Sequence, residues 1–136
     1  MVDDVVRGKA ATIERCLARV REDYVGHESA FVTEQMRQDA IILNLLRACE
    51  AAIDLAMHVV RDRGLGLPER SRDAFTLLED NGLLTGDLAR RMRAMVGFRN
   101  VAVHAYRELD LDVARAVVEQ HLGDFEDFTR HMLQQP

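Results

Sequence analysis

The sequence is poor in several features that mark particular classes of protein. Only two of its 136 residues are proline, and it has no glycine- or serine-rich tract, so neither a linker nor a disordered tail is expected. No apolar run approaches the roughly 18 residues that a membrane span needs. Charges occur within the first few residues, unlike in a secretory signal peptide. We therefore expect one domain over residues 1–136, without a membrane segment, in the cytoplasm.

Cysteine is also scarce, and the spacings typical of metal sites are missing. Cys16 and Cys49 fall on apolar helical stripes, so buried, reduced thiols are expected rather than a disulfide. Neither an H-E-x-x-H motif nor a cysteine-rich spacing occurs. Asp54 and His58 stand four residues apart and can touch on a helix, but two ligands are a weak signal. The sequence therefore predicts no metal site and no cofactor.

The sequence does contain helical periodicity from end to end. Apolar residues recur at steps of three and four over residues 6–24, which is typical of an amphipathic helix that packs against another helix. A second helix is expected over about 33–63, ended by Gly64, Gly66 and Pro68.

Three more helices are expected in the second half of the chain. Ser71 is predicted to cap a short third helix that runs through Glu79, and a fourth helix is predicted to begin at Thr85 or Asp87. Asp110 is predicted to cap the last one. The inward face of that helix should carry Ala114, Val117, Val118, His121, Phe125, Phe128 and Met132. With no β-type alternation, the fold class is all-α: an antiparallel bundle of about five helices.

The second helix is apolar nearly all round between Ala40 and Val60, which predicts a central position in the bundle. Five polar side chains interrupt it, within a stripe roughly 90 to 120° wide. They are Asn44, Arg47, Glu50, Asp54 and His58. Such a stripe must face something polar, either solvent or a polar cleft or dimer interface.

Positive charge is concentrated in one segment, although the whole chain carries a net charge of −5. Residues 88–107 hold five arginines and no acid, so the remainder of the chain carries −10. The arginines are Arg90, Arg91, Arg93, Arg99 and Arg107. Such asymmetry predicts an anionic partner, and the alternative is a solvated arginine-rich helix face. If that partner is RNA, the four arginines other than Arg99 are expected to contact it.

The stretch RNVAVHAY, residues 99–106, places four polar side chains that can bind or react (Arg, Asn, His and Tyr) among small apolar ones. Arginine can bind phosphate oxygens through two parallel hydrogen bonds, and histidine moves protons near neutral pH. Arg99 and His104 are five residues apart, about 140° around an unbroken helix. They can cooperate only if the helix ends, kinks near Gly97 or meets a second copy. Together they suit metal-free phosphoryl transfer, with Arg99 stabilising charge and His104 moving a proton.

The same stretch resembles the R-x-x-x-x-H-x-Y signature of HepT-type toxins in the HEPN superfamily (higher eukaryotes and prokaryotes nucleotide-binding). Three more segments resemble that family in the same order. They are RRMRAMVGFRN before the motif, ILNLLRACEAAIDLAMHVV at 42–60 and GLGLPERSRDAFTLLEDNGLL at 64–84. The resemblance covers most of residues 38–125. It implies an HEPN-like helical fold and the toxin of an MntA–HepT type toxin–antitoxin pair.

The resemblance also implies a role for each residue of the signature. Arg99 and His104 would be the catalytic pair of a metal-independent ribonuclease that uses the RNA 2′-hydroxyl as nucleophile, with tRNA as an expected target. Asn100 would orient His104 or hold phosphate. Tyr106 would receive AMP from an MntA-type nucleotidyltransferase antitoxin. This modification would silence the toxin, because each AMP adds negative charge and bulk at a phosphate site.

Proteins of this family are usually homodimers whose motifs face a shared cleft. In such a dimer, Glu50, Asp54 and His58 would support Arg99 or His104. Two alternatives to a nuclease remain open at this stage. One is a non-catalytic HEPN module that binds nucleotide or RNA, or docks a nucleotidyltransferase; the other is a structural helical dimer with the motif in its core.

Overall fold

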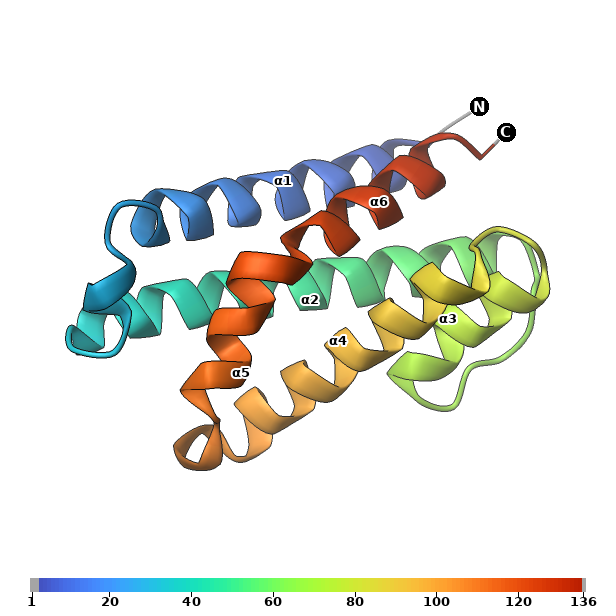
Figure 1. Ribbon diagram of the computed structural model, residues 1–136. Helices are drawn as coiled ribbons and strands as arrows, with labels where there is room; N and C mark the ends of the chain where they lie inside the picture. Colours follow the sequence, from blue (N-terminus) through green and yellow to red (C-terminus); the bar gives the residue numbers. More distant parts are fainter. Residues whose placement is uncertain (1–2, 136) are drawn as a thin grey trace.

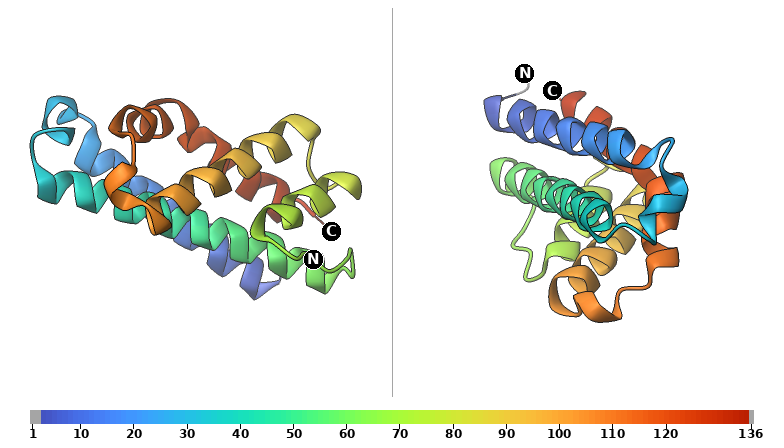
Figure 2. Two further views of the ribbon diagram at one scale, coloured as in Figure 1. Left: turned by 90° about the horizontal axis from the view of Figure 1, so that it is seen from below. Right: turned by 90° about the vertical axis from the view of Figure 1, so that its left-hand side faces the viewer.

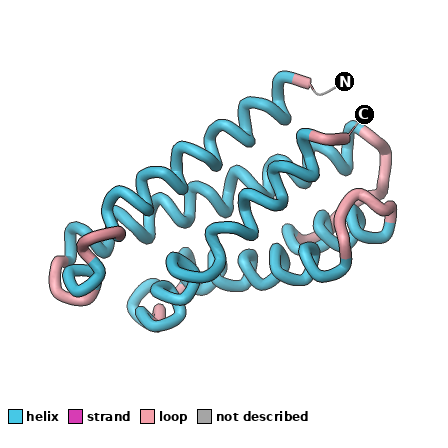
Figure 3. The backbone as a smooth tube through the Cα atoms, turned by 45° about the horizontal axis from the view of Figure 1, so that its top comes forward, coloured by secondary structure: helices cyan, strands magenta, loops and turns pink. Residues whose placement is uncertain are grey.

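The computed structural model describes residues 3–135, and every regular element in that range is helical (Figure 3). The α-helices are α1 (Asp4–Tyr24), α2 (Gln35–Asp62), α3 (Ser71–Asp80), α4 (Gly86–His104), α5 (Leu111–Ala116) and α6 (Leu122–Leu133). Two 3₁₀ turns, η1 (Glu28–Phe31) and η2 (Tyr106–Glu108), and one π turn, η3 (Val117–His121), complete the described range. Because α5, η3 and α6 follow one another without a break, the described chain forms five helical rods. The expected all-α bundle of about five helices is confirmed.

The long helix α2 lies at the centre of the bundle, with α1 on one side and α4 on the other (Figures 1 and 2). It packs against α1, α3, α4 and α6. The start of α1 and the end of α6 lie at the same end of the molecule, because α1 and α6 run antiparallel (Figure 1). This position agrees with the composition of α2, which buries apolar side chains such as Leu45, Ala48 and Leu55 around most of its circumference.

Local capping signals place most of the helix ends. The hydroxyl of Thr85 accepts the backbone N–H of Leu88 at 3.2 Å and begins α4. The carboxylate of Asp110 accepts the N–H of Asp112 at 2.8 Å and begins α5. Helix α2 falls within the predicted range of 33–63. The starts of α4 and α5 follow from side chains next to the helix in sequence, which is why they could be predicted.

The predicted cap of α3 was wrong. Ser71 does not cap α3: it is the first helical residue, and the cap is Arg70, whose backbone N–H donates to the carboxylate of Asp73 at 3.0 Å. Of the arrangements that would let Arg99 and His104 cooperate, a break at Gly97 does not occur, because helix α4 continues without interruption to His104. A single glycine weakens a helix by only about 1 kcal/mol relative to alanine, and packing against α2, α3 and α6 keeps α4 intact.

The last rod contains the π turn η3, which the sequence pattern did not indicate. A π turn inserts one extra residue into a helix and so changes its local geometry. Leu122 takes the inward position that was predicted for His121, and His121 lies only partly buried beside Asp124. The other six residues predicted for the inward face are buried.

Both cysteines meet the expectation of buried thiols outside a disulfide. Cys16 and Cys49 are buried and unpaired, and burial raises the pKa of both thiols. Within residues 3–135, no helix is both long enough and apolar enough to cross a membrane.

Candidate functional site

The signature residues lie where α4 ends and the chain turns into η2. Helix α4 ends at His104, Ala105 leaves the helical conformation, and Tyr106 begins η2. Because the helix is unbroken, Arg99 and His104 point in different directions from it. Arg99 contacts α2, whereas His104 is exposed in the last turn. One copy of the chain therefore does not bring these two side chains together.

Arg99 is held in place by two acceptors. Its Nε donates to Glu50 Oε1 on α2 at 2.5 Å, and its Nη1 donates to the Oδ1 of Asn100 at 2.9 Å. The Nη2 group has no hydrogen bond to any residue between 3 and 135. A guanidinium fixed on one edge and open on the other can bind a phosphate. Asn100 contacts Arg99, and the structure shows no hydrogen bond between Asn100 and His104 within the described chain.

Tyr106 contacts the beginning of α2, a contact that the sequence did not indicate. Its hydroxyl donates to Asp39 Oδ1 at 2.6 Å, and the amide of Gln35, one turn earlier, donates to the same oxygen at 2.8 Å. Burial and the bond to the Asp39 carboxylate raise the pKa of Tyr106 to about 12. Sequence reasoning missed Asp39 because 67 residues separate it from Tyr106.

The polar stripe of α2 divides among several partners. Glu50 contacts the signature through Arg99, but Asp54 pairs with Lys9 of α1 at 3.2 Å. His58 Nε2 lies 2.8 Å from Asp3 Oδ2. The structure thus places Asp54 and His58 against α1 and its cap rather than at Arg99 or His104. The Glu50 and Asp54 side chains stay 45% and 55% exposed while they make these contacts, as the solvent-facing alternative for the stripe predicts.

Two further residues complete this stripe. Asn44 is buried and donates to the backbone carbonyl of Ala40 at 3.0 Å, whereas Arg47 is exposed.

Asp62, one turn beyond His58, brings a carboxylate oxygen close to the Asp3–His58 pair, with all three ligand atoms within 4.8 Å of one another. His58 and Asp3 already bond to each other there, so we assign no metal to this group.

The arginines before the signature are paired with carboxylates of the same chain. Arg90 contacts Asp87 at 2.5 Å, and Arg91 contacts Asp87 at 3.1 Å and also Asp124. The buried Asp124 side chain also accepts a hydrogen bond or ion pair from His121 Nδ1 at 3.0 Å. The acid-free run in the sequence is therefore not an uncompensated positive surface, because acids from its flank and from α6 reach it.

The remaining two arginines differ from each other. Arg93 pairs with Glu79 of α3 at 3.0 Å. Arg107 is exposed and, within the described chain, forms no hydrogen bond or ion pair. Of the four arginines predicted to bind RNA, Arg107 alone keeps its charge uncompensated in residues 3–135, and it is next to Tyr106.

A shallow groove of about 400 Å³ runs between α1, α2 and the end of α4. Its lining is mixed: the Lys9–Asp54 ion pair lies in it, and both Leu43 and Val103 leave 47% of their surface exposed. Glu50, the partner of Arg99, lines the same groove. Exposed apolar side chains beside charged residues are typical of a surface that contacts another macromolecule.

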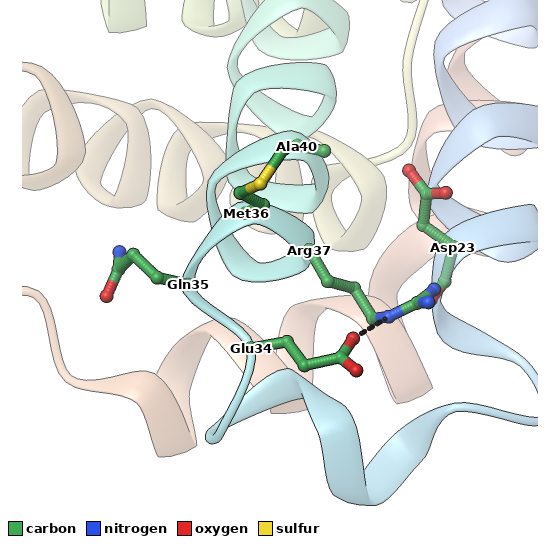
Figure 4. A pocket seen from close by; sticks show the side chains of 6 residues that line it. All are labelled: Asp23, Glu34, Gln35, Met36, Arg37 and Ala40. Carbon is green, nitrogen blue, oxygen red and sulfur yellow. Dashed lines mark hydrogen bonds and ion pairs between the residues drawn. The ribbon is translucent and has the colours of Figure 1, made fainter.

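A second pocket, of about 550 Å³, opens at the beginning of α2 (Figure 4). Arg37 reaches across it, donating to Glu34 at 2.8 Å and to the backbone carbonyl of Asp23 at 2.8 Å. These bonds tie the start of α2 to the end of α1. They thereby fix the helical turn that carries Gln35 and Asp39.

A helical bundle that gathers Arg, Asn, His and Tyr at the end of its fourth helix has the architecture of an HEPN ribonuclease. The family described as "Ribonuclease HepT-like" matches residues 13–132, and the chain belongs to that family. The family, the fold and the enzyme class expected from the resemblance, a ribonuclease, are thus confirmed.

The similar proteins are close in both sequence and structure. The chain is 49% identical to the mRNA nuclease HepT of Shewanella oneidensis over 127 residues, which are 93% of this chain and 95% of the relative. It superposes with a TM-score of 0.94 on the tri-AMPylated HEPN toxin of Shewanella oneidensis in complex with an MNT antitoxin. That match has 46% identity and covers 98% of this chain and 100% of the other. A toxin–antitoxin structure with AMP-PNP matches with a TM-score of 0.93, the same identity and the same coverage.

Proposed function

We propose that this chain is the toxin of a toxin–antitoxin pair: a single-domain, metal-independent and cofactor-independent ribonuclease of the cytoplasm. The observation that carries the proposal is the placement of Arg99. Glu50 and Asn100 orient its guanidinium at the end of α4, and an open edge remains for phosphate. The exposed imidazole of His104 lies in the last turn of the same helix, free to take part in proton transfer.

The reaction needs only the substrate and these side chains. The 2′-hydroxyl of the RNA attacks the adjacent phosphorus, the bond to the 5′-oxygen breaks, and a 2′,3′-cyclic phosphate remains. Arg99 stabilises the charge that develops on the phosphorus oxygens. His104 moves a proton at the attacking or leaving oxygen. Asn100 holds Arg99 in register and can offer its amide N–H to phosphate.

A homodimer would complete the site. In one chain Arg99 faces α2 and His104 faces outward, so a second copy is needed to place a histidine opposite an arginine. The groove between α1, α2 and α4 supports this arrangement. It exposes Leu43 and Val103 directly beside Glu50, and burial of such surface is the main driving force of association.

Modification of Tyr106 by a nucleotidyltransferase antitoxin would silence the enzyme. The relative from Shewanella oneidensis is tri-AMPylated and bound to an MNT antitoxin. Tyr106 is exposed in the short η2 turn, two residues after His104. Each AMP would bring a negative phosphate and a base beside Arg107, the cation available to attract RNA.

The RNA itself would be recognised mainly by charge. Arg107 offers an uncompensated guanidinium next to the site, whereas Arg90, Arg91 and Arg93 must exchange a carboxylate for phosphate before they bind. The family resemblance indicates tRNA as a target, whereas the Shewanella oneidensis relative is named for mRNA. Both substrates therefore belong in the test.

The test is cleavage of tRNA and mRNA by the purified, unmodified protein in EDTA. His104→Ala should abolish cleavage and keep the helical circular dichroism spectrum, because His104 is exposed. His27→Ala, at an equally exposed histidine, is the matched control and should cleave normally. The proposal is wrong if EDTA stops the wild type or if the folded His104→Ala protein still cleaves.

A further inference from the structure

The hydroxyl of Tyr106 is already bonded to a base. It donates to Asp39 Oδ1 at 2.6 Å, a contact between η2 and the first turns of α2. Gln35 donates to the same oxygen at 2.8 Å and so restricts the rotation of the carboxylate. Both Tyr106 and Asp39 are exposed, so a partner enzyme can reach the hydroxyl without disturbing the core.

This hydroxyl cannot act as a nucleophile without help at neutral pH. Partial burial of the ring, the hydrogen bond to Asp39 and the charge of Asp39 raise the pKa of Tyr106 to about 12, so almost none of it is ionised at pH 7. A phenol that attacks phosphorus must therefore lose its proton during the reaction. A carboxylate within hydrogen-bond reach of that proton meets the geometric requirement for a general base.

We propose that Asp39 is the catalytic base for the attachment of AMP to Tyr106. The toxin would then provide the base for the reaction that inactivates it. The inference rests on the proposed function, in which Tyr106 receives AMP. ATP, held by the nucleotidyltransferase, is the co-substrate. The Tyr106 oxygen forms a bond to the α-phosphorus while the bond from that phosphorus to the bridging oxygen of the β-phosphate breaks. Pyrophosphate leaves with the electron pair, and the tyrosine proton passes to Asp39 Oδ1 and then to solvent.

Tyr106 that carries AMP would not keep its hydrogen bond to Asp39. Once Tyr106 carries AMP, its oxygen has no proton to donate, and the new phosphate is repelled by the ionised Asp39 carboxylate. The modified side chain therefore turns away from α2. That movement would take the nucleotide away from the Asp39 carboxylate.

The experiment measures the rate of the first AMP addition by intact mass, using the full-length toxin, its cognate nucleotidyltransferase antitoxin and Mg-ATP. Asp39→Asn keeps an oxygen that can accept the Tyr106 hydrogen bond but is a far weaker base. Asp39→Ala removes the contact altogether. Asp62→Asn changes the same residue type at the other end of α2 and is the matched control; Tyr106→Phe identifies the modified residue.

General bases contribute about 100-fold or more to rate, so Asp39→Asn and Asp39→Ala should both lose about 100-fold at pH 7, and Asp62→Asn nothing. The rate of Asp39→Asn relative to the wild type should rise with pH, because hydroxide replaces the missing base. Gln35→Ala should lose less, since the carboxylate remains.

Three results would overturn the inference. Normal rates for Asp39→Asn with slow Asp39→Ala would mean that Asp39 only positions the hydroxyl. Faster transfer in Asp39→Asn would mean that the contact restrains Tyr106. Equal rates in all variants would mean that the antitoxin supplies the base. A wild type that gains no AMP on Tyr106 would instead refute the proposed silencing itself, and this inference with it.

Discussion

Glu50→Gln tests whether the carboxylate on α2 positions Arg99. The two side chains are 24% (Arg99) and 45% (Glu50) exposed, and 2.5 Å separates Nε from Oε1. The pair thus lies between a surface ion pair, worth about 0–1 kcal/mol, and a hydrogen bond to a charged group, worth about 1.5–3 kcal/mol. We expect Glu50→Gln to lower the free energy of unfolding by about 1 kcal/mol. For a chain of this size, that corresponds to a drop in Tm of about 3 °C.

The effect on RNA cleavage should be much larger than the effect on stability. Glutamine keeps an oxygen that can accept the Arg99 Nε–H, but it lacks the charge that holds the guanidinium in place. A misplaced binding group can reduce the rate by about 100-fold, whereas a domain that loses about 1 kcal/mol remains almost fully folded. The assay is single-turnover cleavage with enzyme in excess, alongside thermal unfolding of the same samples. A large loss of rate with a small loss of Tm would show that Glu50 acts on the position of Arg99.

Asp54→Asn is the control, one helical turn further along α2. Asp54 is 55% exposed and pairs with Lys9 at 3.2 Å, so its removal should change neither the rate nor the Tm measurably. The reasoning is refuted if Glu50→Gln cleaves RNA at the wild-type rate. It is also refuted if Asp54→Asn loses as much activity as Glu50→Gln.

Three further predictions concern stability and titration. Asp124→Ala should lower the free energy of unfolding by about 2 kcal/mol in urea, because this 8%-exposed side chain is a charged partner of Arg91; an unchanged midpoint would contradict that. Ultraviolet titration, wild type minus Tyr106→Phe, should give a midpoint near pH 12 rather than 10. Because the folded pKa is raised, the stability that it confers is present below about pH 10 and is lost as the pH rises towards 12; a midpoint near 10 would contradict the raised pKa. Cys49, buried with a raised pKa, should resist alkylation until the protein unfolds, and rapid labelling of the native protein would show that the site opens.

The sequence by itself determined the features that depend on neighbours along the chain. Helical periodicity indicated the all-α bundle, and the caps at Thr85 and Asp110 set the starts of α4 and α5. The apolar surface of α2 predicted its central position. The signature from Arg99 to Tyr106 identified the family, because it is read from residue types at fixed spacing.

Only the tertiary structure decided which side chains meet across helices. Glu50 reaches Arg99 over 49 residues, and Asp39 reaches Tyr106 over 67. Spacing along one helix cannot reveal such partners, since they depend on how two helices are rotated and shifted against each other. The same rotation and shift bring Asp54 to Lys9 of α1 within one chain, a partner that spacing along α2 did not reveal.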